Sequence, residues 1–513
     1  MNIQPGLFTL SQLRQLHEAP QQVQLDPSAA GRIAAAAALV HACAQGGDAV
    51  YGVNTGFGKL ANKRIAQADL ETLQLNLLRS HAVGVGKPLS ERVVRLILLL
   101  KAASLARGHS GVRPVVIDTL LALYNANVVP VIPSQGSVGA SGDLAPLAHL
   151  CLPLIGEGEL FYQGERLDAA SALAKAGIAP IRLSAKEGLA LINGTQVSTA
   201  MAIDALFATE TLFEAAVISG AVTLDAARGS DGPFDPRIHA VRGQPGQIDC
   251  AAAYRALMVG SEIRRSHLEG DDRVQDPYCL RCQPQVMGAC LDQMRYAAQV
   301  LLREANAVTD NPLVFPEDGL LLSGGNFHAE PVALAADALA VVIAEIGAIT
   351  ERRIAMLVDT VVSRLPPFLT PEPGLNSGFM IVHVTAAALA SENKSLAHPA
   401  SVDSLPTSAN QEDHVSMATF AARRLQLMLR NTGYIVAIEL LAAAQGIEFL
   451  RPLKSSHVLE GILALVRSVS PAMMTDRSLA PDMEAVFQLL LQGRVGLTGE
   501  AEIAELTGLR LTA

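Results

Sequence analysis

The chain has 513 residues, of which 50% are hydrophobic, 17% charged and 4% aromatic, and its formal net charge is −10. The acidic balance, without any basic block, disfavours nucleic-acid binding, and the high apolar content excludes intrinsic disorder. Ordinary soluble domains carry about 25% charged residues, so we expect part of the apolar surface to be covered in subunit contacts.

The location is predicted to be cytoplasmic. Residues 1–6 lack the basic start and apolar run of a signal peptide. The most apolar stretch, 332–356, is interrupted by charged residues, including Asp337 and Glu345. It therefore contains no uncharged run of about 18 residues, and no membrane span is expected.

Helical periodicity dominates the chain, and alternating strand-like runs are few and short. In chain order, helical patterns cover 92–106, 113–126, 196–227, 287–308, 331–357, 421–442 and 455–468. The pattern at 287–308 repeats apolar residues with 4-3-4-3 spacing, which is typical of one seam of a bundled helix. The pattern at 331–357 is apolar nearly all round and predicts a helix of about 40 Å buried between others.

The breakers between these helices form loops and do not divide the chain into separate domains. They lie at 130–142, 229–236, 243–246, 366–378 and 399–410. With no repeat or low-complexity linker, the sequence predicts a single, mainly α-helical unit over 1–513. Within it, we expect an N-terminal region, about 1–110, to pack on a central helical bundle, about 111–513.

Six scattered cysteines are expected to be reduced thiols. Cys279 and Cys282 have the spacing of half a zinc site, but a structural zinc site needs four ligands and no second pair follows. Histidines such as His149, His328 and His414 do not cluster into ligand triads by spacing. We therefore assign no metal.

The glycine-spaced loop at 136–142, followed by Asp143, is the most informative segment. It could be a turn entering a helix at 143–146, with an acid and a proline in the first turn. It could also cradle a phosphate at a helix start, although Asp143 would repel the anion and the expected strand and Lys are missing.

A third interpretation is chemical. Attack of the Gly142 nitrogen on the carbonyl carbon of Ala140 would close a five-membered ring, and loss of the Ser141 hydroxyl would leave an exocyclic methylidene. The backbone must be bent hard for this, and Gly142, which lacks a Cβ, can bend at the least steric cost. The product would be an electrophile made from the chain itself.

The sequence resembles the histidine and aromatic amino-acid ammonia-lyases over nearly its whole length. The matching segments are 51–58, 140–143, 188–196, 275–282, 323–328, 391–394 and 411–417. The resemblance implies a homotetrameric, helical fold with active sites at subunit interfaces. It also implies a 4-methylidene-imidazol-5-one (MIO) group formed from Ala140, Ser141 and Gly142, with no external cofactor.

The resemblance also implies roles in proton transfer and carboxylate binding. Tyr51 is the expected base, and its phenol, which ordinarily titrates near 10, must be activated by its neighbours. Tyr278 is a second active-site phenol. Arg281 would bind the substrate carboxylate through its planar fork, a geometry that Lys cannot match. By themselves, these residues could equally be packing residues or a surface ion pair.

Further positions are implied for substrate contacts. Asn193 and Gln275 would orient the substrate carboxylate and amine without adding charge, although backbone capping would explain them equally well. Phe327 would form a wall near the ring, although a buried Phe is ordinarily part of the core.

Two residues bear on the side chain of the substrate. His81 matches the position that reads this side chain and argues only against phenylalanine, since tyrosine-specific members also tend to have His there. Glu412 can accept a hydrogen bond from an imidazole N–H, whereas facing a benzene ring it would be buried without a partner. It therefore favours L-histidine, with trans-urocanate as the product, unless it is simply an acid in the first turn of the next helix.

Several alternatives stay open. Tyrosine deamination or an aminomutase is the rival within the family, and a non-catalytic helical scaffold is the rival of another class. A fumarase-like lyase is disfavoured because its Gly-Ser-Ser loop is absent. Cys279, where Ser is commoner, and His383, where Gln is commoner, depart from the family pattern.

Overall fold

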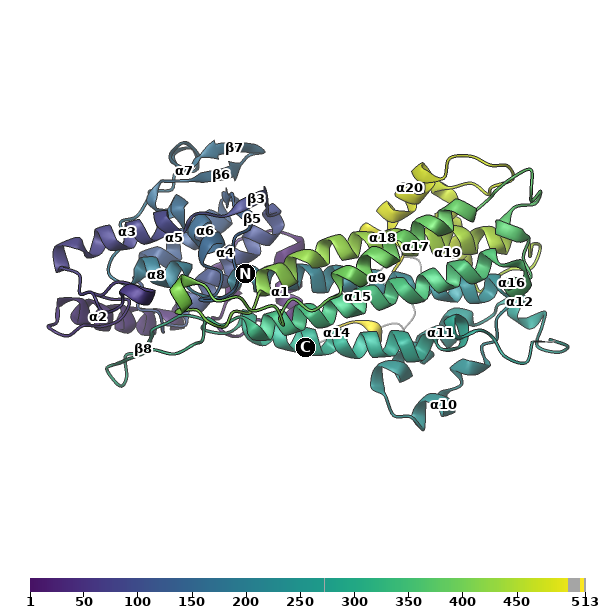
Figure 1. Cartoon of the computed structure of the whole chain (residues 1–513), viewed down its shortest axis with the longest axis horizontal. Helices are drawn as coiled ribbons and strands as arrows, with labels where there is room; N and C mark the ends of the chain where they lie inside the picture. The colour runs from purple at the N-terminus through teal and green to yellow at the C-terminus, as the bar shows by residue number, and fades with distance from the viewer. Residues whose placement is uncertain (272, 497–507, 512–513) are drawn as a thin grey trace.

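A computed structural model describes residues 1–271, 273–496 and 508–511, and its long helices lie side by side as a bundle (Figure 1). The core helices are α9 (Gln196–Ala226), α14 (Gln283–Ala305), α15 (Glu330–Val358) and α18 (Ala418–Glu448). They confirm the helices predicted over 196–227, 287–308, 331–357 and 421–442, and with them a mainly α fold.

The apolar surface of these helices is used in packing. By length and composition, α9, α15 and α18 could each cross a membrane, and among the described residues they are the helices with this property. In the fold, 89%, 67% and 83% of their most apolar windows are buried, respectively. Most of that apolarity therefore faces protein, as expected for helices that are apolar nearly all round.

α14 follows the predicted seam but is shorter at its C-terminal end. Met287, Leu291 and Met294 are buried along it, whereas Val308 lies beyond its last residue. The Asn306 amide donates to the carbonyl oxygens of Leu302 (3.0 Å) and Phe8 (2.9 Å). This contact ends the helix and ties the chain to the N-terminal segment.

An ion pair lies fully buried inside the bundle. Arg353 on α15 pairs with Glu439 on α18, and both side chains are 0% exposed. Arg353 also donates to the side-chain oxygens of Gln283 (3.2 Å) and Thr350 (3.1 Å). Breaking such a pair from one side would leave a buried charge without a partner, so it fixes the register of the two helices.

Shorter helices surround the far half of the bundle. They are α10 (Pro236–Ala240), α11 (Pro245–Met258), α12 (Glu262–Arg265), α13 (Tyr278–Arg281), α16 (Thr360–Ser363), α17 (Met380–Leu396), α19 (His457–Val469) and α20 (Ala480–Leu491). α19 confirms the helix predicted at 455–468.

The other half is a lobe of short helices and strands. Its helices are α1 (Leu10–Glu18), α2 (Ala30–Gln45), α3 (Leu70–His81), α4 (Glu91–Ala106), α5 (Pro114–Asn125), α6 (Leu144–Cys151), α7 (Ala169–Ala176) and α8 (Glu187–Ile192). α4 and α5 confirm the predictions at 92–106 and 113–126.

Strands are short, as the sequence predicts, and pair in small sheets. They are β1 (Asn2–Ile3), β2 (Gln24–Leu25), β3 (Val85–Pro88), β4 (Val129–Pro130), β5 (Pro133–Gln135), β6 (Glu159–Tyr162), β7 (Glu165–Asp168), β8 (Leu313–Phe315) and β9 (Leu320–Leu322). β1 pairs in parallel with β2, while β3–β5, β4–β6–β7 and β8–β9 are antiparallel.

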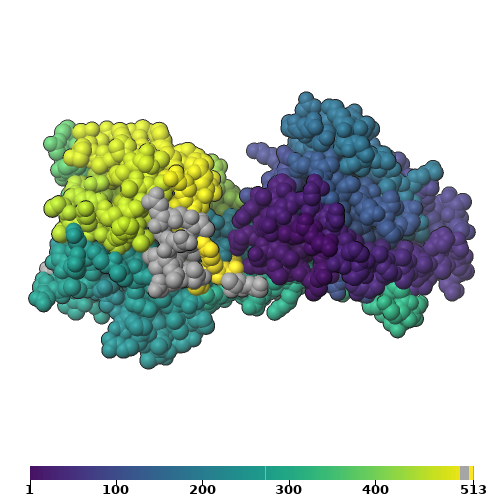
Figure 2. Space-filling view, turned by 180° about the vertical axis from the view of Figure 1, so that it is seen from behind, coloured from purple at the N-terminus to yellow at the C-terminus, as the bar shows by residue number. Residues whose placement is uncertain are grey.

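One hydrophobic cluster joins the lobe to the bundle and runs from Ile3 to Leu511. Figure 2 shows the lobe and the C-terminal helices as two masses connected through a narrower middle. The single unit over 1–513, of which 272, 497–507 and 512–513 lie outside the described residues, stays a prediction, and so does the division near residue 110.

Candidate active site

A cavity of about 1320 Å³ opens where the lobe meets the near end of the bundle. It brings together seven residues that the sequence analysis placed in one site. They are Tyr51, His81, Ala140, Ser141, Asn193, Phe327 and Glu412. Gly142 directly follows two of them, so the predicted ring-forming tripeptide lies at the wall of the cavity.

The backbone at Gly142 is bent and tightly enclosed. Its φ is +74°, and a Cβ at this position would overlap the carbonyl oxygen of Gly194. That same oxygen accepts the amide of Asp143 at 2.8 Å. The turn between α8 and α9 therefore presses on the tripeptide, and only a glycine fits there without strain.

Asp143 holds this bend in place. Its carboxylate is 0% exposed and accepts the amide and hydroxyl of Ser198 (2.8 and 2.9 Å) and the hydroxyl of Thr419 (2.6 Å). Ser198 is in the first turn of α9, where the helix dipole favours an anion. Burial raises the pKa of Asp143, and these hydrogen bonds oppose that effect.

The helix entry expected at 143–146 is confirmed, because Asp143 stands at the N-cap of α6 and Pro146 is in its first turn. The Asp143 side chain, however, makes no cap there. Its oxygens bind the first turns of α9 and α18 instead, so one carboxylate connects the tripeptide to two core helices.

The residues just before the tripeptide are bound by the segment that leads into α18. The Ser416 hydroxyl donates to the Gly139 carbonyl (3.1 Å), and the Met417 amide donates to the Val138 carbonyl (2.9 Å). The tripeptide is thus held between the starts of α9 and α18, both parts of the rigid bundle.

A buried lysine that the sequence analysis missed supports the wall behind Asn193. Lys101 on α4 is 1% exposed, and its ammonium donates to the Asn193 carbonyl at 2.6 Å. Burial lowers the pKa of Lys101 to about 8, although the charge of Asp310 opposes the shift. A single cation inside the apolar run 96–106 was the signal that could have identified it.

Glu412 points at the tripeptide. Its Oε1 accepts the Ser141 hydroxyl at 2.9 Å, and its Oε2 accepts the hydroxyls of Thr407 (2.7 Å) and Ser408 (2.8 Å). The next helix, α18, begins only at Ala418. The alternative of a first-turn acid is therefore wrong, and the carboxylate is fixed in the cavity.

His81 ends α3 with a defined tautomer. Its Nδ1 lies 2.8 Å from the Leu77 carbonyl, which can only accept, so Nδ1 carries the proton in that bond. Burial lowers the pKa of His81, opposed by the Leu77 carbonyl and the charge of Glu412. The neutral ring then has a lone pair on Nε2.

Asn193 has an unused acceptor. It follows α8, and its backbone amide completes that helix by donating to Leu189 at 2.9 Å. Its side-chain Oδ1 is buried with no hydrogen-bond partner. The backbone is therefore already satisfied, and the carboxamide is available to a ligand.

The structure does not bring Gln275, Tyr278 and Arg281 to this cavity. They lie beside the far end of α15, where Gln283 contacts Arg353, whereas Phe327 precedes the near end. The 23 residue steps from Glu330 to Arg353 along α15 correspond to about 35 Å at 1.5 Å per residue. One chain therefore carries the predicted site in two separated parts.

We call residues 273–281 the distal tip. Tyr278 is 71% exposed there, and the Arg281 guanidinium lies 4.6 Å from the centroid of its ring. α13 is a single turn, so the spacing of three places both side chains on one face. The pair is assembled, but it does not line the cavity of its own chain.

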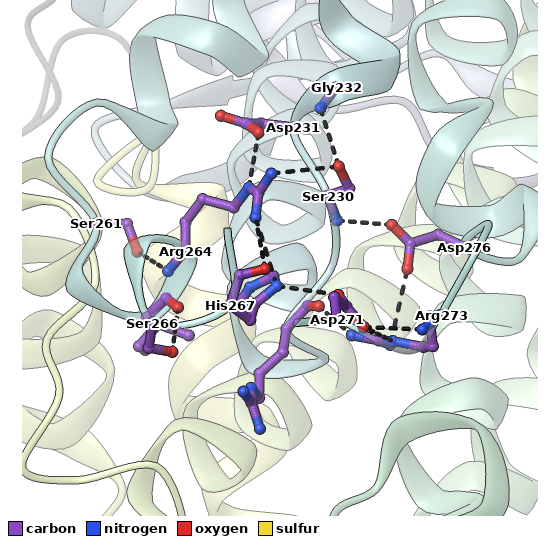
Figure 3. Close-up of polar contacts among 12 residues, drawn as sticks. Ser230, Asp231, Gly232, Ser261, Arg264, Ser266, His267, Asp271, Arg273 and Asp276 are labelled. Carbon is purple, nitrogen blue, oxygen red and sulfur yellow. Dashed lines mark hydrogen bonds and ion pairs between the residues drawn. The ribbon is translucent and has the colours of Figure 1, made fainter. Parts of the chain in front are cut away.

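A polar network anchors the distal tip to the loop at 228–232 (Figure 3). Asp276, which directly follows Gln275, accepts the amide of Ser230 at 2.6 Å. Arg264 pairs with Asp231 at 2.7 Å on the same loop. These contacts join segments separated by over 30 residues, and no motif in the sequence indicates them.

His383 also lies at the far end. It is one turn past Phe379, as predicted, and its Nε2 lies 2.8 Å from Glu351 Oε1. Burial alone would raise the pKa of Glu351, but hydrogen bonds and charges from His383 and Arg352 lower it to about 2.

Two histidines that do not cluster by spacing in the sequence meet an acidic side chain in the fold. His328, Glu330 and His414 place their ligand atoms within 4.8 Å of one another. His149 is separate, and its Nε2 accepts the Gly84 amide at 3.0 Å. More than 80 residues separate His328 from His414 in the chain, so their spacing could not reveal the group.

Comparisons with known proteins agree with this geometry. The aromatic amino acid lyase family matches residues 8–468. The chain is 63% identical over 491 residues to a histidine ammonia-lyase of Rhodospirillum rubrum, an alignment that covers 96% of each protein.

Solved structures share the whole fold. A histidine ammonia-lyase from Trypanosoma cruzi has a TM-score of 0.90 at 43% identity, covering 100% of this chain and 98% of that one. A tyrosine aminomutase from Streptomyces globisporus has a TM-score of 0.93 at 34% identity, covering 98% and 99%. With a family match across most of its length and a tripeptide held as described, the chain belongs to the aromatic amino acid lyase family.

Proposed function

We propose that the chain removes ammonia from L-histidine without oxidation and gives trans-urocanate. The observation that carries this proposal is the carboxylate of Glu412, fixed 2.9 Å from the Ser141 hydroxyl in a cavity that also contains Tyr51 and His81. An imidazole N–H can donate to Oε1 of this carboxylate, whereas a benzene ring would leave Oε1 without a donor. The identity to a histidine ammonia-lyase supports the same substrate.

The residues at 140–142 fit the formation of an MIO ring. Gly142 already has a positive φ, the Gly194 carbonyl accepts the amide of Asp143, and the Asp143 carboxylate is bound to Ser198. The ring, once formed, supplies an electrophile that makes the substrate amine a better leaving group. No external cofactor is required for this.

Glu412 has a second consequence for substrate binding. In the open chain its Oε1 is occupied by the Ser141 hydroxyl. Cyclisation expels that hydroxyl as water, so the oxygen loses its donor. Losing that donor in a partly enclosed cavity is unfavourable, and the N–H of a substrate imidazole can replace it.

The remaining residues in the cavity are assigned to proton transfer and to binding the amine and ring of the substrate. Tyr51 is assigned as the base that accepts the β-proton. The free Oδ1 of Asn193 can accept from the substrate amine, and the neutral His81 offers Nε2 to a donor on the substrate ring. Phe327 closes one wall and excludes water from the reacting atoms.

The carboxylate of the substrate needs a partner that this cavity lacks. Among the described lining residues there is no Arg, and the lysines, Lys59 and Lys63, are both exposed. We therefore assign Gln275, Tyr278 and Arg281 to the same site through the distal tip of another subunit in a homotetramer. Exposed apolar residues on the bundle, including Val341 and Ile381, support such contacts.

Intact mass spectrometry of the purified protein tests the ring directly. Ring formation makes the chain lighter by two molecules of water and adds a near-ultraviolet absorbance that a chain without Trp cannot supply. Ser141→Ala should abolish the mass loss and the activity together. Full activity in that variant, or an unmodified mass in active wild type, would refute the mechanism. An unmodified mass in wild type that is also inactive would favour a scaffold.

A substrate panel tests the assignment of histidine. Glu412→Gln should lower turnover of histidine by at least about 100-fold, because a neutral amide loses the charge-assisted hydrogen bond in the transition state. Thermal stability should change little. Turnover of tyrosine but not histidine by wild type would replace histidine with the tyrosine reaction.

A further inference from the structure

The side chains of His328, Glu330 and His414 meet although they come from two distant segments. Their ligand atoms lie within 4.8 Å of one another. The imidazole rings of His328 and His414 are nearly parallel, with centroids 5.8 Å apart and an interplanar angle of 10°. Within the described ranges, no other group of three or more His, Cys, Asp or Glu side chains converges in this way.

Two of the three side chains have unused capacity to bind a cation. Glu330 Oε2 is buried without a hydrogen-bond partner, at the first residue of α15. His328 Nε2 lies 3.2 Å from the His414 carbonyl oxygen, which can only accept. The ring nitrogen of His328 that is not in this bond keeps its lone pair, as in histidine ligands oriented by a backbone carbonyl.

The group lies at the edge of the cavity described above. His328 and His414 both line that cavity; His328 directly follows Phe327, and His414 is two residues past Glu412. A ligand bound to these side chains would therefore be close to the wall that is assigned to the substrate imidazole.

We propose that His328, Glu330 and His414 form a site for a borderline-soft divalent cation such as Zn²⁺. Two imidazoles and one carboxylate match the ligand set of open zinc sites, in which a fourth position is left for water or another ligand. Tetrahedral zinc ligands are about 3.4 Å apart, so the side chains must draw together on binding. His414 is exposed and free to make that movement.

An imidazole can occupy the fourth position, because imidazole nitrogen is itself a good ligand for these cations. Metal binding and occupancy of the cavity by imidazole compounds are therefore expected to be coupled. This site does not depend on the ring at 140–142 or on the proposed reaction.

Co²⁺ is a suitable probe because its visible absorbance reports its ligands. Chelator-treated protein should bind one equivalent of Co²⁺ or Zn²⁺ per chain by equilibrium dialysis, and added imidazole should shift the Co²⁺ spectrum. His328→Ala, His414→Ala and Glu330→Gln should each weaken binding at least about tenfold. His41→Ala, which removes an exposed histidine bound only to Gln45, should change nothing.

Circular dichroism and intact mass should first show that each variant is folded and unchanged at 140–142. Absence of binding in wild type would overturn the proposal. So would binding that is unaltered in all three ligand variants, which would place the cation elsewhere, for example at the cysteines. Loss of the ring in Ser141→Ala with intact metal binding would separate this site from the proposed function.

Discussion

The two ends of the bundle differ in how they hold their predicted catalytic residues. At the cavity end, the tripeptide is fixed by α8, α9 and α18, and its anchor, Asp143, is fully buried. At the distal tip, Tyr278 is exposed and the anchors are surface loops. The tripeptide, which requires a bent backbone, is thus held by the core helices. The distal tip, which is assigned to the site of another subunit, carries an exposed Tyr278.

Mixing two inactive variants tests whether one active site combines the cavity end of one subunit with the distal tip of another, and it should give the largest effect. Ser141→Ala destroys the cavity end and Tyr278→Phe the distal tip, and each alone should reduce activity by at least about 1000-fold. If one site uses both ends of different subunits, co-expressed variants should regain roughly a quarter of wild-type activity, because about a quarter of sites then receive two intact halves.

The same experiment has a direct control. Ser141→Ala mixed with Glu412→Gln damages two residues of one cavity, and such pairs cannot complement each other across subunits. Recovery in that mixture, or none in the first, would show that the halves of the site are not shared as proposed. Activity per tetramer, with subunit ratios from mass spectrometry, gives the measurement.

Gly142→Ala tests the bend at the cavity end. The new Cβ would overlap Gly194 in a backbone with φ of +74°. The ring should therefore not form, and the free energy of unfolding should fall by about 1–3 kcal/mol. Gly164→Ala is the matched control, because its φ of +82° is similar but nothing lies within 4 Å. Equal losses in both variants, with the ring intact in Gly142→Ala, would contradict the assigned role of Gly194.

Much of this arrangement could be predicted from sequence, and the exceptions share one cause. Apolar periodicity predicted the core helices because each helix must bury a stripe, and the context of Ser141 identified the tripeptide. The contacts of Asp143 with Ser198 and Thr419 were not predictable, since they join positions 55 and 276 residues apart. A pattern within one segment carries no information about which segment it meets.

Lys101→Met tests a support behind the cavity. Without the ammonium, the Asn193 carbonyl loses its 2.6 Å donor, so kcat should fall about tenfold while the ring still forms. Lys101→Arg is the control that keeps a donor. Unchanged kcat in Lys101→Met, with a normal intact mass, would show that Asn193 needs no such support.

The stability of Lys101→Met should also respond differently to pH. The folded pKa of Lys101, about 8, lies below the ordinary value, so the unfolded chain holds this proton more tightly. Its contribution therefore rises as pH increases from about 8 to about 10.4 and is lost as pH falls through 8. Chemical denaturation should show this rise in wild type and a flatter curve in the variant.

The smallest effect is expected from His383→Gln, at the far end of α15. Glu351, with a folded pKa of about 2, contributes stability that is present above about 4.5 and lost as pH falls toward 2. Part of this depends on the hydrogen bond from His383. The gap in the free energy of unfolding between wild type and variant should thus be about 0.5–1 kcal/mol above about pH 4.5, because His383 is partly exposed, and should shrink as pH falls toward 2.

Denaturant titrations from pH 3 to 8 would measure that gap in stability. Activity assays would show whether the His383→Gln substitution also affects the distal tip. Because Glu351 keeps Arg352 as a second partner, we expect kcat to change less than about twofold. A gap that is the same at every pH would mean that His383 acts through packing. A large change in kcat would instead mean that the distal tip depends on α17 as tightly as the tripeptide depends on α9.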